Sequence, residues 1–249
     1  MAAVLTEVVD RVLVVTLNRP DARNAIDGEL AAQLVDAVAE LDSNPLLSTG
    51  VVTGAGRGFC SGMDLKAFAK AGVPKGLLSL MRSGAGKPLV AAVEGFAFAG
   101  GLELALACDL IVASKGARFG IPEVAVGLMA AGGGLVRLPR RLPPAVALEM
   151  ALTGDPLTAE EAYRHGLVSR LTDKSMALSE ALRLAIRIAA NAPLSVAASR
   201  NVVRFATSHS EDETWEHQKA LSSAVFSSDD AREGPRAFAE KRQPRWSGA

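Results

Sequence analysis

The feature that most constrains the fold is the segment from residue 89 to residue 113. It is apolar nearly throughout, yet it contains Glu94, Glu103 and Asp109. Its length would suit a membrane helix, but three acids and several glycines make a membrane span expensive. We therefore expect this segment to lie buried in a globular protein. A buried carboxyl group must be paired, hydrogen-bonded or raised in pKa, and a raised pKa suits general acid and base chemistry.

The surrounding sequence alternates between strand and helix patterns. Strands are predicted by short apolar runs at residues 4–9, 12–17, 50–53, 88–93 and 109–113, and helices by the patterns at 27–41, 76–83 and 100–107. Strands that alternate with helices indicate an α/β fold with a mainly parallel sheet. From about residue 143 the strands largely disappear, and the predicted helices are 144–152, 158–165, 174–190, 194–207 and 211–226.

Charge and cysteine content limit the partners to be expected. Lys plus Arg and Asp plus Glu both number 27, so no net charge attracts the chain to nucleic acid or to an acidic membrane. The first residues show neither a signal peptide nor an import sequence, and we expect a cytoplasmic protein. Cys60 and Cys108 have no companions at metal-ligand spacing. We expect no metal site and interpret both cysteines as small buried residues.

The acids in this apolar segment differ in how strongly they suggest catalysis. Asp109 begins a predicted strand, where bonding to backbone amides is the favoured interpretation, and Glu94 precedes a glycine in a loop that it could stabilise. Glu103 follows Gly100 and Gly101 at a predicted helix start, where free N–H groups and the helix dipole would stabilise an oxyanion. The alternative is that the paired glycines only permit close packing.

Two further features are ambiguous by themselves. Glu123 follows Pro122 at a predicted helix start, a pattern typical of helix capping. The Gly-rich loop 54–62 offers exposed amides, but its spacing fits neither the dinucleotide fingerprint nor the Walker loop. Ser61 in this loop lacks both the Gly-x-Ser-x-Gly elbow and a histidine in a comparable loop, so a serine hydrolase is disfavoured.

Collinear motifs run through nearly the whole chain. They include LNRP (17–20), GFCSGMDL (58–65), KPLVAAV (87–93), AGGLELA (99–105), FGIPE (119–123), LTGD (152–155) and FAEKR (238–242). In this order they resemble the enoyl-CoA hydratase/isomerase (crotonase) superfamily, and most of all an enoyl-CoA hydratase. The resemblance implies a crotonase spiral of ββα units over residues 1–190 and a C-terminal helical trimerisation region at 191–249. It also implies a homotrimer or a dimer of trimers.

The resemblance assigns roles to particular residues. The backbone amides of Ser61 and Gly100 match the positions that bind the thioester oxygen, and Glu103 and Glu123 match the two catalytic glutamates of hydratases. Contacts with coenzyme A or the acyl group are implied for Arg23, Ala25, Gly62, Met63, Asp64, Leu65, Lys66, Phe238 and Lys241, the two in the tail acting from a neighbouring subunit. The expected partner is an acyl-CoA thioester, and no cofactor is expected because coenzyme A is part of the substrate.

The presence of both glutamates predicts syn addition of water across the C2–C3 double bond of a 2-enoyl-CoA, as in fatty acid β-oxidation. An enoyl-CoA isomerase, a carnitinyl-CoA-like dehydratase or another lyase is the alternative within the same fold. A different class of function is a catalytically weak, CoA-binding assembly subunit. Residues 129–135 depart from the Pro-Gly-x-Gly-Gly-Thr of many hydratases, so the acyl chain is not predicted. Residues 66–78 are predicted to form a mobile flap over the substrate.

Overall fold

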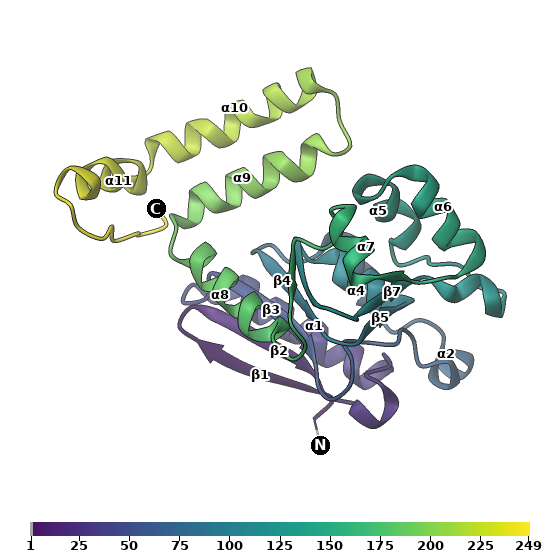
Figure 1. Ribbon diagram of the computed structural model, residues 1–249. Helices are drawn as coiled ribbons and strands as arrows, with labels where there is room; N and C mark the ends of the chain where they lie inside the picture. The colour runs from purple at the N-terminus through teal and green to yellow at the C-terminus, as the bar shows by residue number, and fades with distance from the viewer. Residues whose placement is uncertain (1) are drawn as a thin grey trace. The chain divides into compact units, whose positions relative to one another are not determined.

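The computed structural model describes residues 2–249, which divide into one compact unit that ends at Ala185 and a second that covers Ile186–Ala249. The first unit is built on a six-stranded sheet with the strand order β1-β2-β3-β4-β6-β9 (Figure 1). Its strands are β1 (Val4–Val9), β2 (Val12–Leu17), β3 (Thr49–Gly54), β4 (Leu89–Val93), β6 (Leu110–Ser114) and β9 (Arg170–Thr172). β1 and β2 form an antiparallel hairpin, and every other neighbouring pair is parallel.

A second, three-stranded sheet contains β5 (Phe96–Phe98), β7 (Arg118–Gly120) and β8 (Leu157–Thr158). In each repeat of the chain, one strand joins the large sheet, the next strand joins the small sheet, and a helix follows. The chain passes from β4 to β5 to helix α4 (Gly100–Ala107), and from β6 to β7 to the 3-10 helix η2 (Pro122–Val126). A bridge between Cys60 and Ala97 extends the second sheet by one position. The predicted α/β fold and its ββα repeat are confirmed.

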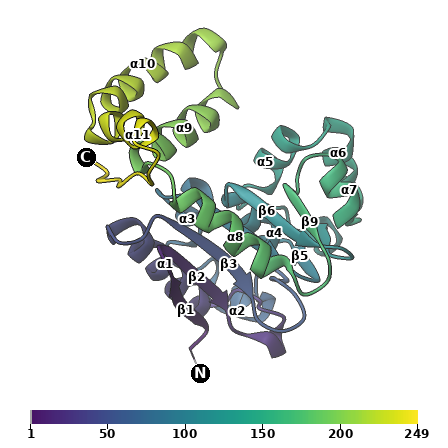
Figure 2. The same cartoon turned by 60° about the vertical axis from the view of Figure 1, so that its left-hand side comes forward.

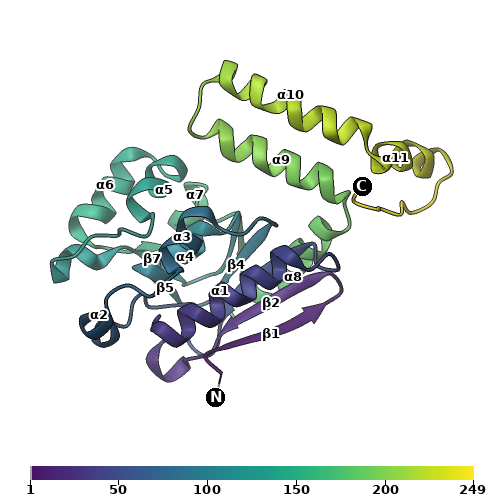
Figure 3. The same ribbon diagram turned by 180° about the vertical axis from the view of Figure 1, so that it is seen from behind.

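Helices cover both faces of the large sheet. α1 (Gly28–Ser43) crosses one face and α8 (Ala177–Ala189) the other, as the opposite views in Figures 1 and 3 show. The carboxylate of Asp27 caps α1 by accepting a hydrogen bond from Leu30 N at 2.9 Å. All eight residues of α4 are buried. The rigid centre of the unit therefore carries the Gly100–Glu103 segment.

The remaining helices of the first unit lie in the connections between its strands. They are η1 (Pro20–Ala22), α2 (Leu65–Ala71), α3 (Leu77–Ser83), α5 (Gly134–Arg141), α6 (Pro144–Thr153) and α7 (Ala159–Arg164). The predicted flap at residues 66–78 thus contains most of a regular helix, α2, whose N-terminus is capped by Asp64. Gly72 and Gly76, both at positive φ, end α2 and begin α3.

The second unit consists of α9 (Pro193–Ala206), α10 (Glu211–Ser227) and α11 (Asp229–Ala239). α9 and α10 run antiparallel as a helical hairpin (Figures 1 and 2), and Ser210 and Glu213 form a capping box at the start of α10. The Glu233 carboxylate, on α11, accepts hydrogen bonds from Arg242 and from Arg245 N, which fix the tail. The predicted helices are confirmed, and the division of the chain into two units falls within α8.

The apolar segment 89–113 forms β4, β5, α4 and β6. Asp109 accepts a hydrogen bond from Leu89 N at 2.9 Å, and Glu94 accepts bonds from the amides of Ser175 and Ala177 at the start of α8. The structural interpretations of these two acids are confirmed. Within residues 2–249, no single helix has the length and apolar character needed to cross a membrane, although the bent pair α8 and α9 meets both criteria when taken together.

Candidate active site

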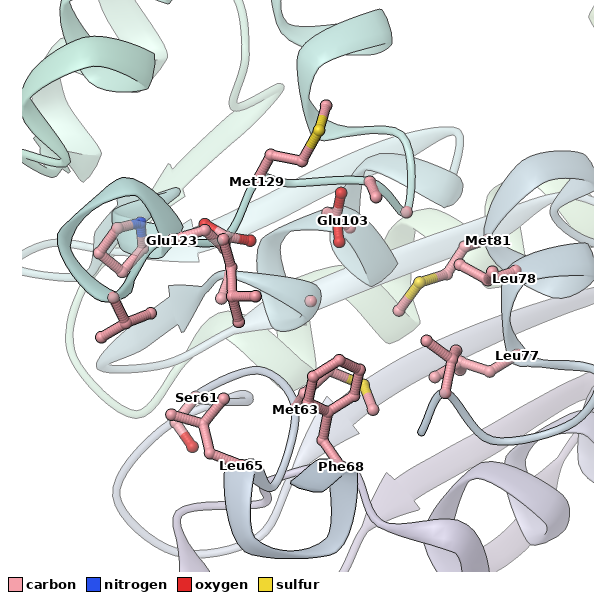
Figure 4. Close-up of a pocket in the computed structure, with 18 of the residues that line it drawn as sticks. Ser61, Met63, Leu65, Phe68, Leu77, Leu78, Met81, Glu103, Glu123 and Met129 are labelled. Atoms are coloured by element: carbon pink, nitrogen blue, oxygen red, sulfur yellow. The ribbon is translucent and has the colours of Figure 1, made fainter. Parts of the chain in front are cut away.

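A cavity of about 490 Å³ lies in the first unit beside the N-terminus of α4. Ser61, Gly100, Glu103 and Glu123 all line it, although they come from three separate stretches of the chain. Figure 4 shows the two glutamate carboxyl groups on one side of this cavity, with Ser61, Met63 and Phe68 across from them. The fold therefore brings together the acids and the Gly-rich segments that the sequence singled out.

Glu103 lies in the first turn of α4 and is only 5% exposed. Its Oε1 accepts a hydrogen bond from Gly134 N at 2.9 Å. Burial raises the pKa of Glu103, while the amides of the Gly132–Gly134 turn and the charge of Arg137 oppose that rise. Glu103 is thus a buried acid held in one orientation by main-chain donors, with a pKa moved toward the range of general acid and base catalysis.

Glu123 lies in the first turn of η2, directly after Pro122 at the first helical position. Burial raises the pKa of Glu123, the residue's own backbone amide opposes part of that rise, and the nearby charge of Glu103 adds to it. Its Oε2 is buried and has no hydrogen-bond partner among residues 2–249. A buried acceptor without a partner is costly, so this oxygen is prepared to bond to a molecule in the cavity.

Backbone amides line the cavity where α4 begins. The first N–H groups of a helix have no partner within that helix, and Gly100 is the first residue of α4. A Cβ atom built on Gly100 would lie 3.6 Å from Met63 N, and this amide donates to no acceptor in the described part of the chain. The amides of Gly100 and Met63 are therefore two neighbouring donors at the cavity wall.

The structure corrects the expected role of the Ser61 amide. Ser61 N donates to the carbonyl oxygen of Arg23 at 3.1 Å, a bond that joins the Gly-rich loop to the loop after β2. This donor is already used within the fold, so it does not provide the second N–H beside Gly100. Ser61 lines the cavity, but Met63, two residues later, supplies the unpaired amide.

Glycines permit the close approach of α4 to the Gly-rich loop. A Cβ on Gly101 would lie 2.4 Å from Cys60 O, and one on Gly62, which has φ +102°, would lie 2.6 Å from the Ala99 Cβ. Ala99 itself has φ +49°, a region that favours glycine. The start of α4 can approach the Gly-rich loop this closely because Gly62 and Gly101 have no side chains. The backbone of Ala99, just before α4, is strained.

The other implied ligand-contact residues are distributed unevenly. Met63 and Leu65 line the cavity, whereas Arg23, Ala25, Gly62 and Lys66 do not. The carbonyls of Arg23 and Ala25 accept hydrogen bonds from Ser61 N and from the Arg19 guanidinium, respectively.

Asp64 caps α2 by accepting from the amides of Lys66 and Ala67, and it forms an ion pair with Arg19 at 3.2 Å. Its side chain therefore has a structural role. Phe238 and Lys241 belong to the second unit, where Phe238 is almost fully exposed.

Apolar residues that the sequence did not assign individually to the site make up much of the wall, although several of them lie in the predicted flap at 66–78. They are Phe68 on α2, Leu77, Leu78 and Met81 on α3, and Leu128 and Met129 after η2. The spacing of Leu77 and Met81 by one helical turn was the available signal, but it is equally typical of a core helix.

A buried asparagine, Asn24, holds the loops around the site. Asn24 donates to the carbonyls of Ala55 and Gly58, both at 2.9 Å, and accepts from Arg19 N. Cys60, buried beside it, has its pKa raised by burial to about 12, so its thiol stays protonated. No group of three or more potential metal-ligating side chains occurs in the described residues.

Comparisons with known proteins identify the family of this chain. The sequence model described as enoyl-CoA hydratase/isomerase matches residues 7–249. The chain is 40% identical to carnitinyl-CoA dehydratase of Proteus mirabilis, over 95% of both chains. It is 42% identical to enoyl-CoA hydratase EchA19 of Mycobacterium tuberculosis, over 93% of this chain and 91% of that one.

Solved structures extend the likeness to the fold. The crystal structure of enoyl-CoA hydratase EchA1 from Mycobacterium marinum superposes with a TM-score of 0.96, at 49% identity and over 100% of both chains. An enoyl-CoA hydratase from Mycobacterium tuberculosis gives a TM-score of 0.95 at 48% identity, also over 100% of both chains. These matches show that the chain belongs to the enoyl-CoA hydratase/isomerase family and has the crotonase fold.

Proposed function

We propose that the protein is an enoyl-CoA hydratase, which adds water reversibly to the C2–C3 double bond of a 2-enoyl-CoA thioester. The observation that carries this proposal is the convergence of Glu103 and Glu123 on one cavity beside the free amides of Gly100 and Met63. An acyl thioester bound there would place its carbonyl oxygen at the amides and its double bond near the acids.

In the proposed reaction the two acids have complementary tasks. Glu103 takes a proton from a water molecule as the water oxygen bonds to C3, and electrons of the double bond move onto the thioester carbonyl. The Gly100 and Met63 amides stabilise the resulting enolate oxygen, and Glu123 gives a proton to C2. Burial raises the pKa of both glutamates toward neutral pH, where a carboxyl group can both accept and donate a proton more readily.

An enoyl-CoA isomerase is supported less well, because moving a double bond along the chain needs one proton shuttle and no water. Dehydration of a 3-hydroxyacyl-CoA is the same reaction in reverse, and the carnitinyl-CoA dehydratase relatives make a cationic acyl group a second candidate substrate. We propose a homotrimer or a dimer of trimers as the assembly, following the family.

The decisive test measures hydration of crotonyl-CoA by the loss of enoyl absorbance. Glu103→Gln and Glu123→Gln should each lower kcat by about 10²- to 10⁴-fold, because each removes one proton-transfer group. Glu94→Gln is the matched control, since this carboxylate bonds to amides at the start of α8 and does not line the cavity. It should leave kcat within about twofold.

Full hydration by either cavity variant would contradict the paired-acid mechanism. Absence of turnover by the wild type on short and long enoyl-CoA esters, together with tight binding of those esters, would favour the CoA-binding assembly subunit instead.

A further inference from the structure

Apart from the acids, the cavity wall is almost entirely hydrocarbon and thioether. Among the described residues that line it, the side chains with hydrogen-bonding groups are Ser61, Glu103 and Glu123. Three methionines, Met63, Met81 and Met129, line it, and flexible methionines adapt their shape to apolar ligands. An acyl group that enters meets no polar side chain beyond the groups needed for the reaction itself.

The outer rim of the cavity exposes large apolar side chains from three different segments. Leu65 on α2 is 52% exposed, Leu78 on α3 is 47% exposed, and Met129 after η2 is 62% exposed. Single exposed apolar residues are ordinary, but several that converge on one cavity are typical of a binding surface. The hydrophobic effect would favour a ligand that covers them.

Buried side chains of α3 form the inner part of the cavity wall. Leu77 and Met81 from this helix are at most 1% exposed. A Cβ atom on Gly132 would lie 2.6 Å from Glu103 Oε2 and 2.7 Å from Met81 Sδ, so the sulfur and the carboxylate lie against the same glycine. Figure 4 shows Met81 on the far side of Glu103 from Glu123. An acyl chain whose reacting carbons lie between the acids and whose tail runs on past Glu103 would therefore reach Met81.

A cationic acyl terminus has no suitable partner in this wall. Recognition of a quaternary ammonium group generally uses several aromatic faces, and Phe68 is the single aromatic residue among the described lining residues. Glu103 is already bonded to Gly134 N, and both acids are committed to the reacting carbons. A buried cation would lose its hydration without compensation.

We infer that the acyl subsite selects an uncharged hydrocarbon chain that runs along α3, and that Met81 determines how long a chain is accepted. The inference rests on the proposed function, because it assumes that the reacting carbons lie between Glu103 and Glu123. It excludes acyl groups that end in a trimethylammonium group.

The chain-length claim is tested by two measurements on the same ligand series. Saturated acyl-CoA esters, which cannot be hydrated, are titrated by calorimetry, and the corresponding 2-enoyl-CoA esters are assayed for kcat/KM. From four to eight carbons, both affinity and kcat/KM should rise by about fourfold per methylene, equivalent to about 0.8 kcal/mol. Hydration without a length dependence would overturn the inference and leave the proposed function intact. Length-dependent binding without hydration would overturn the proposed function and leave only an apolar acyl-binding cavity.

The charge claim uses a pair of ligands of the same shape. One enoyl-CoA ends in a trimethylammonium group, and its neutral counterpart ends in a tert-butyl group. The neutral ester should have a kcat/KM at least about tenfold higher. Equal or better turnover of the cationic ester would overturn the inference and identify a cationic substrate.

The role of Met81 is tested by changing its size. Met81→Phe should lower the ratio of eight-carbon to four-carbon kcat/KM by about tenfold or more, and Met81→Ala should move the preferred length to longer chains. Leu80→Ala is the matched control, because Leu80 is buried on the same helix and does not line the cavity. It should lower Tm without changing the ratio. An unchanged ratio in both Met81 variants, with Tm values above the assay temperature, would exclude Met81 as the length determinant.

Discussion

At the level of single residues, the cavity holds two acids in positions where their charged forms are disfavoured. Glu123 has its pKa raised by burial and by the charge of Glu103, and its Oε2 has no protein partner in the described residues. The folded protein is therefore less stable than it would be with an uncharged side chain at position 123. A loss of folding stability of this kind is typical of functional sites. It can be measured without any substrate.

Glu123→Gln should make the protein more stable at neutral and alkaline pH. A glutamate whose pKa is higher in the folded state binds its proton longer when folded, so folding stability falls as pH rises above the unfolded pKa of about 4.3. Glutamine removes this loss. Thermal unfolding from pH 4 to pH 8 should therefore show a Tm difference in favour of the variant that grows with pH, and a variant less stable than the wild type at pH 8 would contradict the electrostatic account. Exposed Glu149→Gln is the control for loss of a carboxyl group elsewhere.

Gly132→Ala should impair catalysis through the position of Glu103. The added Cβ would lie 2.6 Å from Glu103 Oε2, too close for any real contact, so the carboxyl group must move. A displacement of about 1 Å at a catalytic group can lower the rate by about 10²-fold. Gly28→Ala is the control, because a Cβ there meets nothing within 4 Å. Wild-type kcat in Gly132→Ala would show that Glu103 tolerates displacement.

At the level of secondary-structure elements, the site depends on loops that are tied to one another rather than on any one helix. The loop after β2, the Gly-rich loop after β3 and the start of α4 meet around Asn24, Cys60 and Gly101. Asn24 has φ +56° and is 1% exposed, so its side chain replaces water as the partner of two loop carbonyls.

Asn24→Asp should loosen this junction. The substitution keeps the acceptor for Arg19 N but removes the donor to the carbonyls of Ala55 and Gly58, which then face a carboxylate. Leaving buried carbonyls unsatisfied costs about 1–3 kcal/mol each, and the free energy of unfolding from urea titration should fall by about that amount. Asn18→Asp, whose amide bonds to an exposed carbonyl, should change it by less than about 0.5 kcal/mol. Equal effects of the two substitutions would contradict the junction role.

The longer elements were predictable from sequence because their patterns are strong. The β1–β2 hairpin, α1 with its Asp27 cap, and α4 behind its glycines follow from local chemistry and periodicity. β5, β7, β8 and β9 have two or three residues each and carry no periodicity, so tertiary pairing alone defines them. The choice between the Ser61 and Met63 amides was also beyond sequence, because it depends on which N–H the Arg23 carbonyl already accepts.

At the level of the whole molecule, the two compact units are stabilised in different ways. The first has a core of apolar side chains between its sheets and helices, whereas no residue of α9 or α10 is buried in the described chain. In the second unit, Glu233 accepts bonds from Arg236, Arg242 and Arg245 N, and Asp230 accepts from Ser247 and Gly248. These two acids hold the C-terminal segment in place.

Acid should therefore loosen the second unit before the first. The guanidinium groups of Arg242 and Arg236 and the Arg245 amide hold the pKa of Glu233 well below its usual range. This stabilisation is complete above the unfolded pKa of about 4.3 and is lost as pH falls toward the lower folded pKa. Glu233→Gln should reproduce that loss at neutral pH. Hydrogen exchange should then accelerate in α9–α11 but not in β2–β4, and faster exchange in both units would contradict independent stabilisation.

The methionine-lined cavity has a consequence for how the protein withstands oxidants. Thioether sulfur is readily converted to sulfoxide, which turns a flexible apolar side chain into a polar one. Met129 is exposed at the cavity rim and Met81 is buried at its inner end, so peroxide reaches the rim first. Within the cavity, oxidation would thus begin at Met129, where the acyl chain of the proposed substrate would enter. It would leave the carboxyl groups of Glu103 and Glu123 chemically intact, and sulfoxide reductases can reverse it.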